Sequence, residues 1–176
     1  MTHHQRDLEA ELASAQEETR HAFESRALIY AHLYDVLEEE FGAERAADLM
    51  KRAIYRRGLE IAAKYRAASL AGDLDEIGRL FVEGSACDGA LFTPSVDERA
   101  AEEGRIVLRM DTCPLKDAWI RSDRTPEQVD ELCEIAAAVD LGTFEGAELG
   151  IRFLDRQPCA GGSGRCLLEI TMPERG

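Results

Sequence analysis

Apolar residues in the first part of the chain recur at helical spacing. Between positions 22 and 41 the large apolar side chains are separated by intervals of three, four and seven, and they are Phe23, Tyr30, Leu33, Tyr34, Leu37 and Phe41. This spacing predicts that they form one buried stripe of a helix. Gly42 can end this helix. A second helix is predicted over about 44–68. It contains Gly58, where glycine costs about 1 kcal/mol relative to alanine, so we expect another element or a ligand to approach closely there.

The segment before these helices is more polar. Residues 5–20 are mostly Glu, Ala, Gln and Arg, and only Leu8 and Leu12 can anchor them. We therefore expect residues 1–21 to form a solvated or partner-facing helix beside a single α+β domain of residues 22–176. A weakly anchored helix of this kind favours self-association, so we predict a homodimer.

The remainder of the chain mixes strands with short helices. A helix is predicted over 73–83, and apolar alternation and composition then predict strands over 89–96, 104–112, 149–155 and 165–171. The acidic run DERAAEE is predicted to connect the first two strands, and the glycine-rich CAGGSG to join the last two as a hairpin.

Two helices are predicted between the second and third strands. The segment CPLKDAWIRSD forms a short helix, and a longer helix runs to about Val139 and stops near Gly142. Its start combines Thr125, Pro126 and Gln128, which is typical of a capping box. Helices first, then four strands interrupted by two short helices, predict an α+β fold with a mainly antiparallel sheet.

Composition limits the classes of partner. The 176 residues are 45% hydrophobic and 32% charged, which suits one folded core, but the formal net charge is -14. Such a surface repels phosphate backbones and anionic lipid, and Lys and Arg form no run of five. We therefore expect no nucleic-acid or membrane binding. Without an apolar signal region or a membrane-length apolar stretch, a cytoplasmic location is predicted.

The cysteines are the main candidates for chemistry. Five of them, an odd number without a signal peptide, predict free thiols. Pro114 fits a first helical turn and so places Cys113 at the helix N-cap, where amide N–H groups and the helix dipole favour a thiolate. Alternatively, Cys113 only fills a tight junction. Cys133 and Cys166 fall at core-like positions, on a helix and on the last strand.

Other side chains are candidates for supporting roles. His32, with Asp35 one helical turn onward, is the candidate general acid or base, although a surface role is the alternative. Trp119 is a candidate pocket wall, and Asp111 a substrate contact. Arginines that could clamp a substrate carboxylate by bidentate hydrogen bonds are Arg56, Arg57, Arg105 and Arg152, and among them we select Arg57.

Taken in order, these segments resemble a known family. A strand running into TCPLKDAWIRSD, a helix holding ELCEI, a strand GIRF and a final GRCLLEI resemble the L-2-amino-thiazoline-4-carboxylic acid hydrolases. The stretch RALIYAHLYDVLEEEFGAERAADLMKRAIYRRGLEIA is similar to the helical pair that opens those proteins, so the resemblance covers roughly residues 22–172. It implies a small cytoplasmic hydrolase that opens a thiazoline ring. It also implies that Cys113, Cys133 and Cys166 occupy the family's cysteine positions, whereas Cys87 and Cys159 do not.

A more distant likeness is to the ligand-binding domains associated with 4-vinyl reductases and vesicle-tethering subunits. That likeness implies binding of small hydrophobic molecules without turnover.

Three hypotheses for function follow from these residues. A hydrolase would use a Cys113 thiolate, with Cys133 and Cys166 nearby and His32 moving protons, and would need no cofactor. A binding module would use the same cysteines to line an apolar pocket. The third hypothesis is a zinc or other thiophilic metal held by the three thiols, although their irregular spacing and the lack of a CxxC pair disfavour it. Convergence of the three thiols on a cavity that also holds His32 would favour catalysis.

Overall fold

The computed structural model describes residues 3–100, 103–158 and 162–173. Four antiparallel strands form one sheet in the order β1-β2-β4-β3: β1 (Pro94–Ala100), β2 (Arg105–Met110), β3 (Gly150–Asp155) and β4 (Cys166–Thr171). The helices are α1 (His3–Phe41), α2 (Ala43–Ile61), α3 (Arg66–Ala71), α4 (Leu74–Glu83), α5 (Pro114–Arg121), α6 (Pro126–Ala136) and α7 (Ala138–Gly146), with short 3-10 turns η1 (Ala62–Lys64) and η2 (Ala86–Gly89).

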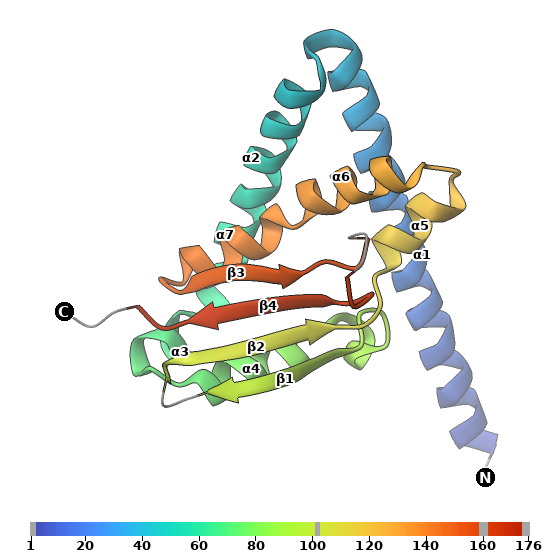
Figure 1. The fold of residues 1–176 in the computed structure, drawn as a ribbon. Helices are drawn as coiled ribbons and strands as arrows, with labels where there is room; N and C mark the ends of the chain where they lie inside the picture. The colour runs from blue at the N-terminus through green and yellow to red at the C-terminus, as the bar shows by residue number, and fades with distance from the viewer. Residues whose placement is uncertain (1–2, 101–102, 159–161, 174–176) are drawn as a thin grey trace.

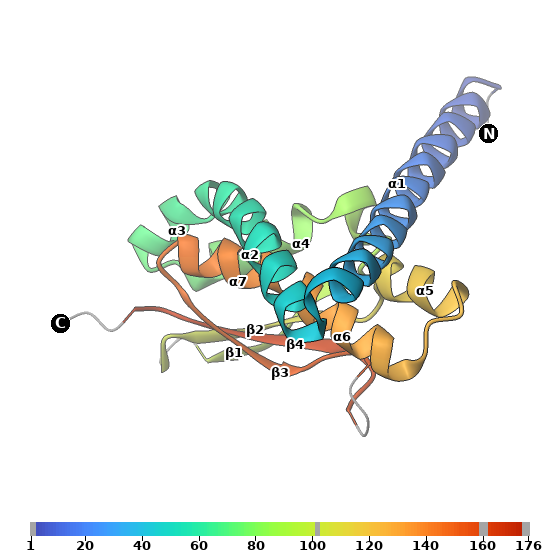
Figure 2. The same ribbon diagram turned by 90° about the horizontal axis from the view of Figure 1, so that it is seen from above.

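The helices gather on one face of the sheet (Figures 1 and 2). Helix α4 packs against β1 and β2, and α7 packs against β3. The other face of the sheet carries charged cross-strand pairs such as Arg152 with Glu169, whose atoms lie 2.9 Å apart. This arrangement confirms the predicted α+β class with an antiparallel sheet.

Helix α1 is longer than its apolar stripe predicted. It runs without a break from His3 to Phe41, so the polar segment 5–20 continues the apolar helix. Figures 1 and 2 show its N-terminal half projecting away from the rest of the molecule. Among the described residues, no helix is long and apolar enough to span a membrane.

The first strand begins later than predicted. Residues 89–96 were expected to be extended, but η2 and a turn occupy most of this range, and β1 begins at Pro94. The acidic residues expected in a connection instead pair with β2, because Glu98 accepts a 2.7 Å hydrogen bond from Arg105 and Asp97 one of 3.3 Å from Arg109. Cross-strand charge pairing of this kind offsets the low strand propensity of acidic residues.

The second of the two predicted inserted helices is in fact two helices. The capping box is confirmed, because Thr125 Oγ1 accepts from the Gln128 amide and the Gln128 side chain accepts from the Thr125 amide. The chain then bends at Ala137, and α7 continues past the expected stop at Gly142 to Gly146. Gly142 does not end the helix because it lies at a helix crossing. The helix predicted over 44–68 is also divided. Its first part, α2, ends at Ile61, and η1 and α3 follow.

Helices α2 and α7 cross in direct backbone contact, which confirms the close approach expected at Gly58. A methyl group on Gly58 would overlap the carbonyl oxygen of Val139, and one on Gly142 would overlap that of Tyr55. Because these neighbours are backbone atoms on paired helices, neither can move aside without shifting a helix.

Replacing this glycine tests the crossing. Helix propensity alone would make Gly58→Ala stabilising, but the overlap should instead destabilise the protein by about 3 kcal/mol. Urea unfolding monitored by circular dichroism measures the change. Gly78→Ala in α4 is the matched control, because its added methyl would meet the side-chain atoms Ile106 Cδ1 and Val96 Cγ2 rather than backbone. Equal losses for the two variants would contradict the special role of the crossing.

Candidate active site: a cavity lined by three thiols

Three of the cysteines line one cavity of about 380 Å³ between the helices and the sheet. Cys113 precedes α5, Cys133 lies in α6, and Cys166 is the first residue of β4. They are near enough to interact electrostatically, because negative charge on Cys113 or Cys166 would raise the pKa of Cys133. The cavity is of a size that suits a small ligand.

Local structure positions two of the three thiols, Cys166 and Cys113. β2 ends at Met110, which pairs with Cys166 in the β2–β4 ladder, and both side chains line the cavity. Cys113 is extended, with φ -151° and ψ 111°, and Pro114 begins α5 directly after it. Cys113 therefore occupies the N-cap position that the sequence predicted.

The electrostatics of Cys113 differ from the sequence-based expectation. The amides of Leu115 and Lys116 favour its thiolate, but burial outweighs them and raises the pKa of Cys113. Burial also raises the pKa of Cys166 to about 11 and that of Cys133 well above its usual range. Removing a thiolate from water disfavours the charged form, so the free protein holds protonated thiols at neutral pH.

Asp140 in α7 is the titratable group that sequence reasoning missed. It lines the cavity, and burial alone raises its pKa to about 7. Among the described residues no hydrogen bond or ion pair reaches its carboxylate, although its charge interacts with Cys166 and Tyr65. A carboxyl group with a pKa near neutrality can both accept and donate a proton. Its signal in the sequence is a lone acid in the apolar run AAAVDLGTF.

Two further polar groups line the same cavity. Gln157 donates a 3.3 Å hydrogen bond from Nε2 to the Met110 carbonyl, while its buried Oε1 has no partner among the described residues. Arg26 is exposed and makes no ion pair within that part of the chain, and its guanidinium lies 4.3 Å from the ring centroid of Phe23. The cavity thus offers a free acceptor inside and a free cation at its mouth.

Of the other residues predicted for the site, one lines the cavity and three do not. Trp119 lines the cavity, is fully buried, and donates a 2.7 Å hydrogen bond to the Ala27 carbonyl. Three candidates lie outside it: Asp111 pairs with Arg109, Arg57 pairs with Glu60, and His32 is 77% exposed on α1.

The partner expected for His32 is engaged elsewhere. Asp35 accepts two hydrogen bonds of 2.6 and 2.5 Å from Arg124, which lower its pKa, whereas His32 Nδ1 lies 3.8 Å away from it. The cavity therefore contains Asp140 where we expected His32. Of the cysteines expected to be incidental, Cys87 does not line the cavity, and Cys159 lies outside the described residues.

The thiols do not form a metal-ligand cluster. Within residues 3–100, 103–158 and 162–173, no three His, Cys, Asp or Glu side chains are arranged to hold an ion. The three cysteines share the cavity walls without presenting the compact set of ligands that a thiolate zinc site needs.

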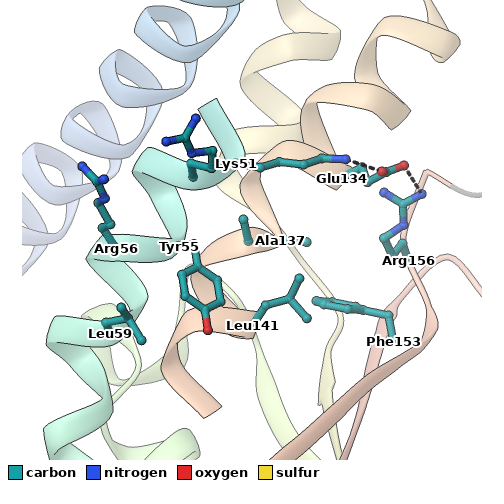
Figure 3. A pocket seen from close by; sticks show the side chains of 11 residues that line it. Lys51, Tyr55, Arg56, Leu59, Glu134, Ala137, Leu141, Phe153 and Arg156 are labelled. Atoms are coloured by element: carbon teal, nitrogen blue, oxygen red, sulfur yellow. Dashed lines mark hydrogen bonds and ion pairs between the residues drawn. The ribbon is translucent and has the colours of Figure 1, made fainter. Parts of the chain in front are cut away.

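A second hollow of about 670 Å³, the basic groove, adjoins the cavity, and Figure 3 shows the side chains that line this groove. It has cationic side chains over an apolar floor, and its lining residues are Lys51, Arg52, Tyr55, Arg56, Leu59, Glu134, Ala137, Ala138, Leu141, Phe153 and Arg156. Ala137, Phe153 and Arg156 also line the cavity, so the two hollows share a wall.

Comparison with known proteins assigns the chain to a family. No curated protein matches it. The family model described as L-2-amino-thiazoline-4-carboxylic acid hydrolase matches residues 21–169, which include Cys113, Cys133, Cys166 and Asp140. With most of its length matched, the chain belongs to this family of small-molecule hydrolases.

Proposed function

We propose that the protein opens the ring of a 2-amino-thiazoline-4-carboxylate, or a close cyclic analogue, in the thiol-lined cavity. The observation that carries the proposal is the presence of three thiols and a carboxyl group of neutral pKa in one small cavity. The family match supports hydrolysis over binding without turnover.

The polar groups of the cavity complement such a substrate. The ring carbon between sulfur and nitrogen carries an amino group, so this part of the molecule is an isothiourea that is cationic when protonated. Asp140 supplies a negative charge and Gln157 Oε1 a free acceptor for its N–H groups. At the cavity mouth Arg26 binds the carboxylate, because charge-assisted bonds to a guanidinium are strong and directional.

Ring opening begins with attack by Cys113. Its sulfur forms a bond to the cationic ring carbon, and the thiol proton passes to the Asp140 carboxylate, so no thiolate is needed in the free protein. Among the three cysteines, Cys113 is the one at a helix N-terminus. Two backbone amides of that helix favour its thiolate, so they stabilise the charge that develops on sulfur. The adduct then breaks its ring carbon–sulfur bond, because a thiolate leaves more readily than an amine, and protonated Asp140 supplies the proton to that sulfur.

Hydrolysis of the covalent intermediate completes the cycle. Asp140, again ionised, takes a proton from water while the water oxygen bonds to the same carbon. The bond to Cys113 then breaks, and the hydroxyl proton returns to its sulfur. The net reaction consumes one water, yields an open-chain thiol with a carbamoyl group on nitrogen, and releases one proton from Asp140.

The role of Cys113 is tested with L-2-amino-thiazoline-4-carboxylate as substrate and mass spectrometry of the product. Cys113→Ser should lower kcat at least about 100-fold, since a hydroxyl is a far weaker nucleophile than sulfur. Cys87→Ser, outside the cavity, is the matched control and should stay within about twofold of the parent. Tight binding by the parent protein without any product would instead support a binding module, and full activity of Cys113→Ser would remove the covalent step.

Asp140 makes a prediction about pH. Because Asp140 must be ionised to accept a proton, kcat/KM should rise with pH through a midpoint near 7. In Asp140→Asn this rise with pH should disappear, and the rate should fall about 100-fold.

The same carboxyl group affects stability. A folded pKa above the unfolded value means that Asp140 increasingly destabilises the fold as pH rises from about 4 to about 7. Asp140→Asn should therefore be more stable than the parent at about pH 8, by up to about 4 kcal/mol.

Thermal unfolding at several pH values measures this second effect. Glu148→Gln, an exposed acid just after α7, is the charge-matched control and should change neither rate nor stability. An Asp140→Asn variant that is active and less stable at about pH 8 would show that the carboxylate has a structural role.

A further inference from the structure

The basic groove contains a cation that the described residues leave unpaired. Acidic residues outnumber basic ones enough to give the chain a net charge of -14. Even so, Arg56 makes no hydrogen bond or ion pair with any described residue, whereas its neighbour Arg57 lies 2.7 Å from Glu60. An unpaired guanidinium beside a hollow is available to an anionic ligand.

The other cations of the groove are each contacted by a carboxylate, so Arg56 is the charge left unmatched among the described lining residues. Glu134, the acidic residue among them, is shared by Lys51 and, at 3.7 Å, by Arg156, whose guanidinium also lies 3.3 Å from Asp130. Figure 3 shows Lys51, Glu134 and Arg156 as a connected rim along one side of the groove. Arg52 adds a further cation, which lies 3.7 Å from Asp48.

Below the rim the groove is apolar. Leu141 and Phe153 face one another in Figure 3, with Ala137 and the ring of Tyr55 beside them. The Tyr55 hydroxyl donates a 2.8 Å hydrogen bond to Glu145, so the polar end of this side chain is already satisfied. The floor can therefore receive an apolar body but offers few polar contacts.

We propose that the basic groove is a second ligand site, which takes a small amphipathic carboxylate with a flat or branched apolar body. The apolar body packs on Leu141 and Phe153, and the carboxylate bonds to Arg56 and its cationic neighbours. This site is separate from the hydrolytic cavity. Because Arg156 and Phe153 line both hollows, an occupant of the groove contacts the wall of the cavity.

Calorimetric titration with 2-naphthylacetate and its uncharged analogue 2-naphthaleneethanol tests this site. The carboxylate should bind at least about tenfold more tightly than the alcohol. Arg56→Gln should weaken binding about tenfold, whereas Arg57→Gln, which removes the same charge from the next residue, should change it less than about twofold. Asp140→Asn should bind the probe as the parent does, so the outcome does not depend on the proposed hydrolysis.

Each other outcome would overturn the proposal. Equal weakening by Arg56→Gln and Arg57→Gln would indicate attraction by net charge alone. Equal affinity for the carboxylate and the alcohol would indicate an apolar hollow without an anion site. Absence of binding at millimolar probe would remove the site.

A different observation concerns the exposed side of α1. Six large apolar side chains along this helix are 46% to 60% exposed. Five of them share one side, and they are Leu8, Leu12, Ile29, Leu33 and Val36, while the sixth is Phe41 at the end of the helix. With the small residues Ala15 and Ala22 between them, the five follow one heptad series with steps of four, three and seven residues, in which the steps of seven pass over Thr19 and Arg26. Heptad spacing of this kind forms the seam of a coiled coil. The buried face of α1, with Ala27 and Tyr34, lies on another side of the helix.

We infer that α1 pairs with α1 of a second copy, antiparallel and centred on Ala22. In this register the projecting Leu8 and Leu12 of one copy cover Val36 and Leu33 of the other. Glu11 then lies beside His32, whose imidazole N–H can donate a hydrogen bond to that carboxylate. The same patch serves both copies, as a two-fold interface requires.

Sedimentation velocity tests the interface. The parent chain should be a dimer, Leu12→Glu should be a monomer, and Ser14→Glu, which adds the same charge off the seam, should remain a dimer. Under oxidation, Leu12→Cys mixed with Leu33→Cys should form a disulfide-linked dimer, whereas Leu12→Cys alone should not. A monomeric parent, a dimeric Leu12→Glu or self-linking of Leu12→Cys would overturn this inference.

Discussion

The close crossing of α2 and α7 is the contact on which the candidate site depends. Gly58 and Gly142 let the two backbones touch, and this contact fixes α7 against the helical layer. Asp140 lies less than one turn before Gly142, so the crossing also sets where its carboxylate enters the cavity. The bend at Ala137 then directs α6, which carries Cys133, along the adjacent wall. The two glycines thus determine where Asp140 and Cys133 lie in the cavity wall.

Burial has opposite consequences for the groups it brings together. It raises the pKa of all three thiols and so works against a resting thiolate at Cys113, despite the favourable helix N-terminus. The same burial raises the pKa of Asp140 to about 7, into the range where a carboxyl group exchanges protons at neutral pH. A cavity of this kind suits a reaction in which sulfur loses its proton only as it attacks. In the proposed reaction, the Asp140 carboxylate, which has no partner among the described residues, would favour a cationic substrate.

The distribution of charge separates the surfaces of the molecule. Most arginines are engaged by nearby carboxylates, as on the open face of the sheet, where Arg105 contacts Glu98, Glu103 and Glu169. The basic groove departs from this pattern because Arg56 makes no ion pair with a described residue, while Glu134 is shared by Lys51 and Arg156. Helix α1 departs from it in another way, since its uncovered side is apolar. These two surfaces are the ones for which we propose contacts with other molecules.

The sequence by itself determined the helical state of residues 22–41, the capping box at Thr125, the α+β class and the N-cap position of Cys113, because periodicity and capping act over a few residues. It also indicated a close approach at Gly58. The predicted stripe of α1 was wrong at Leu33 and Phe41, which are 46% and 59% exposed. Tertiary structure decided that Asp140 rather than His32 shares the cavity with the thiols, since a helix register does not say which face another element will cover. It likewise decided the start of β1, where arginines on β2 pair with acids that local propensity assigned to a loop. Finally, it decided the pKa of Cys113, because burial, which no local pattern contains, outweighed the helix dipole that the sequence revealed.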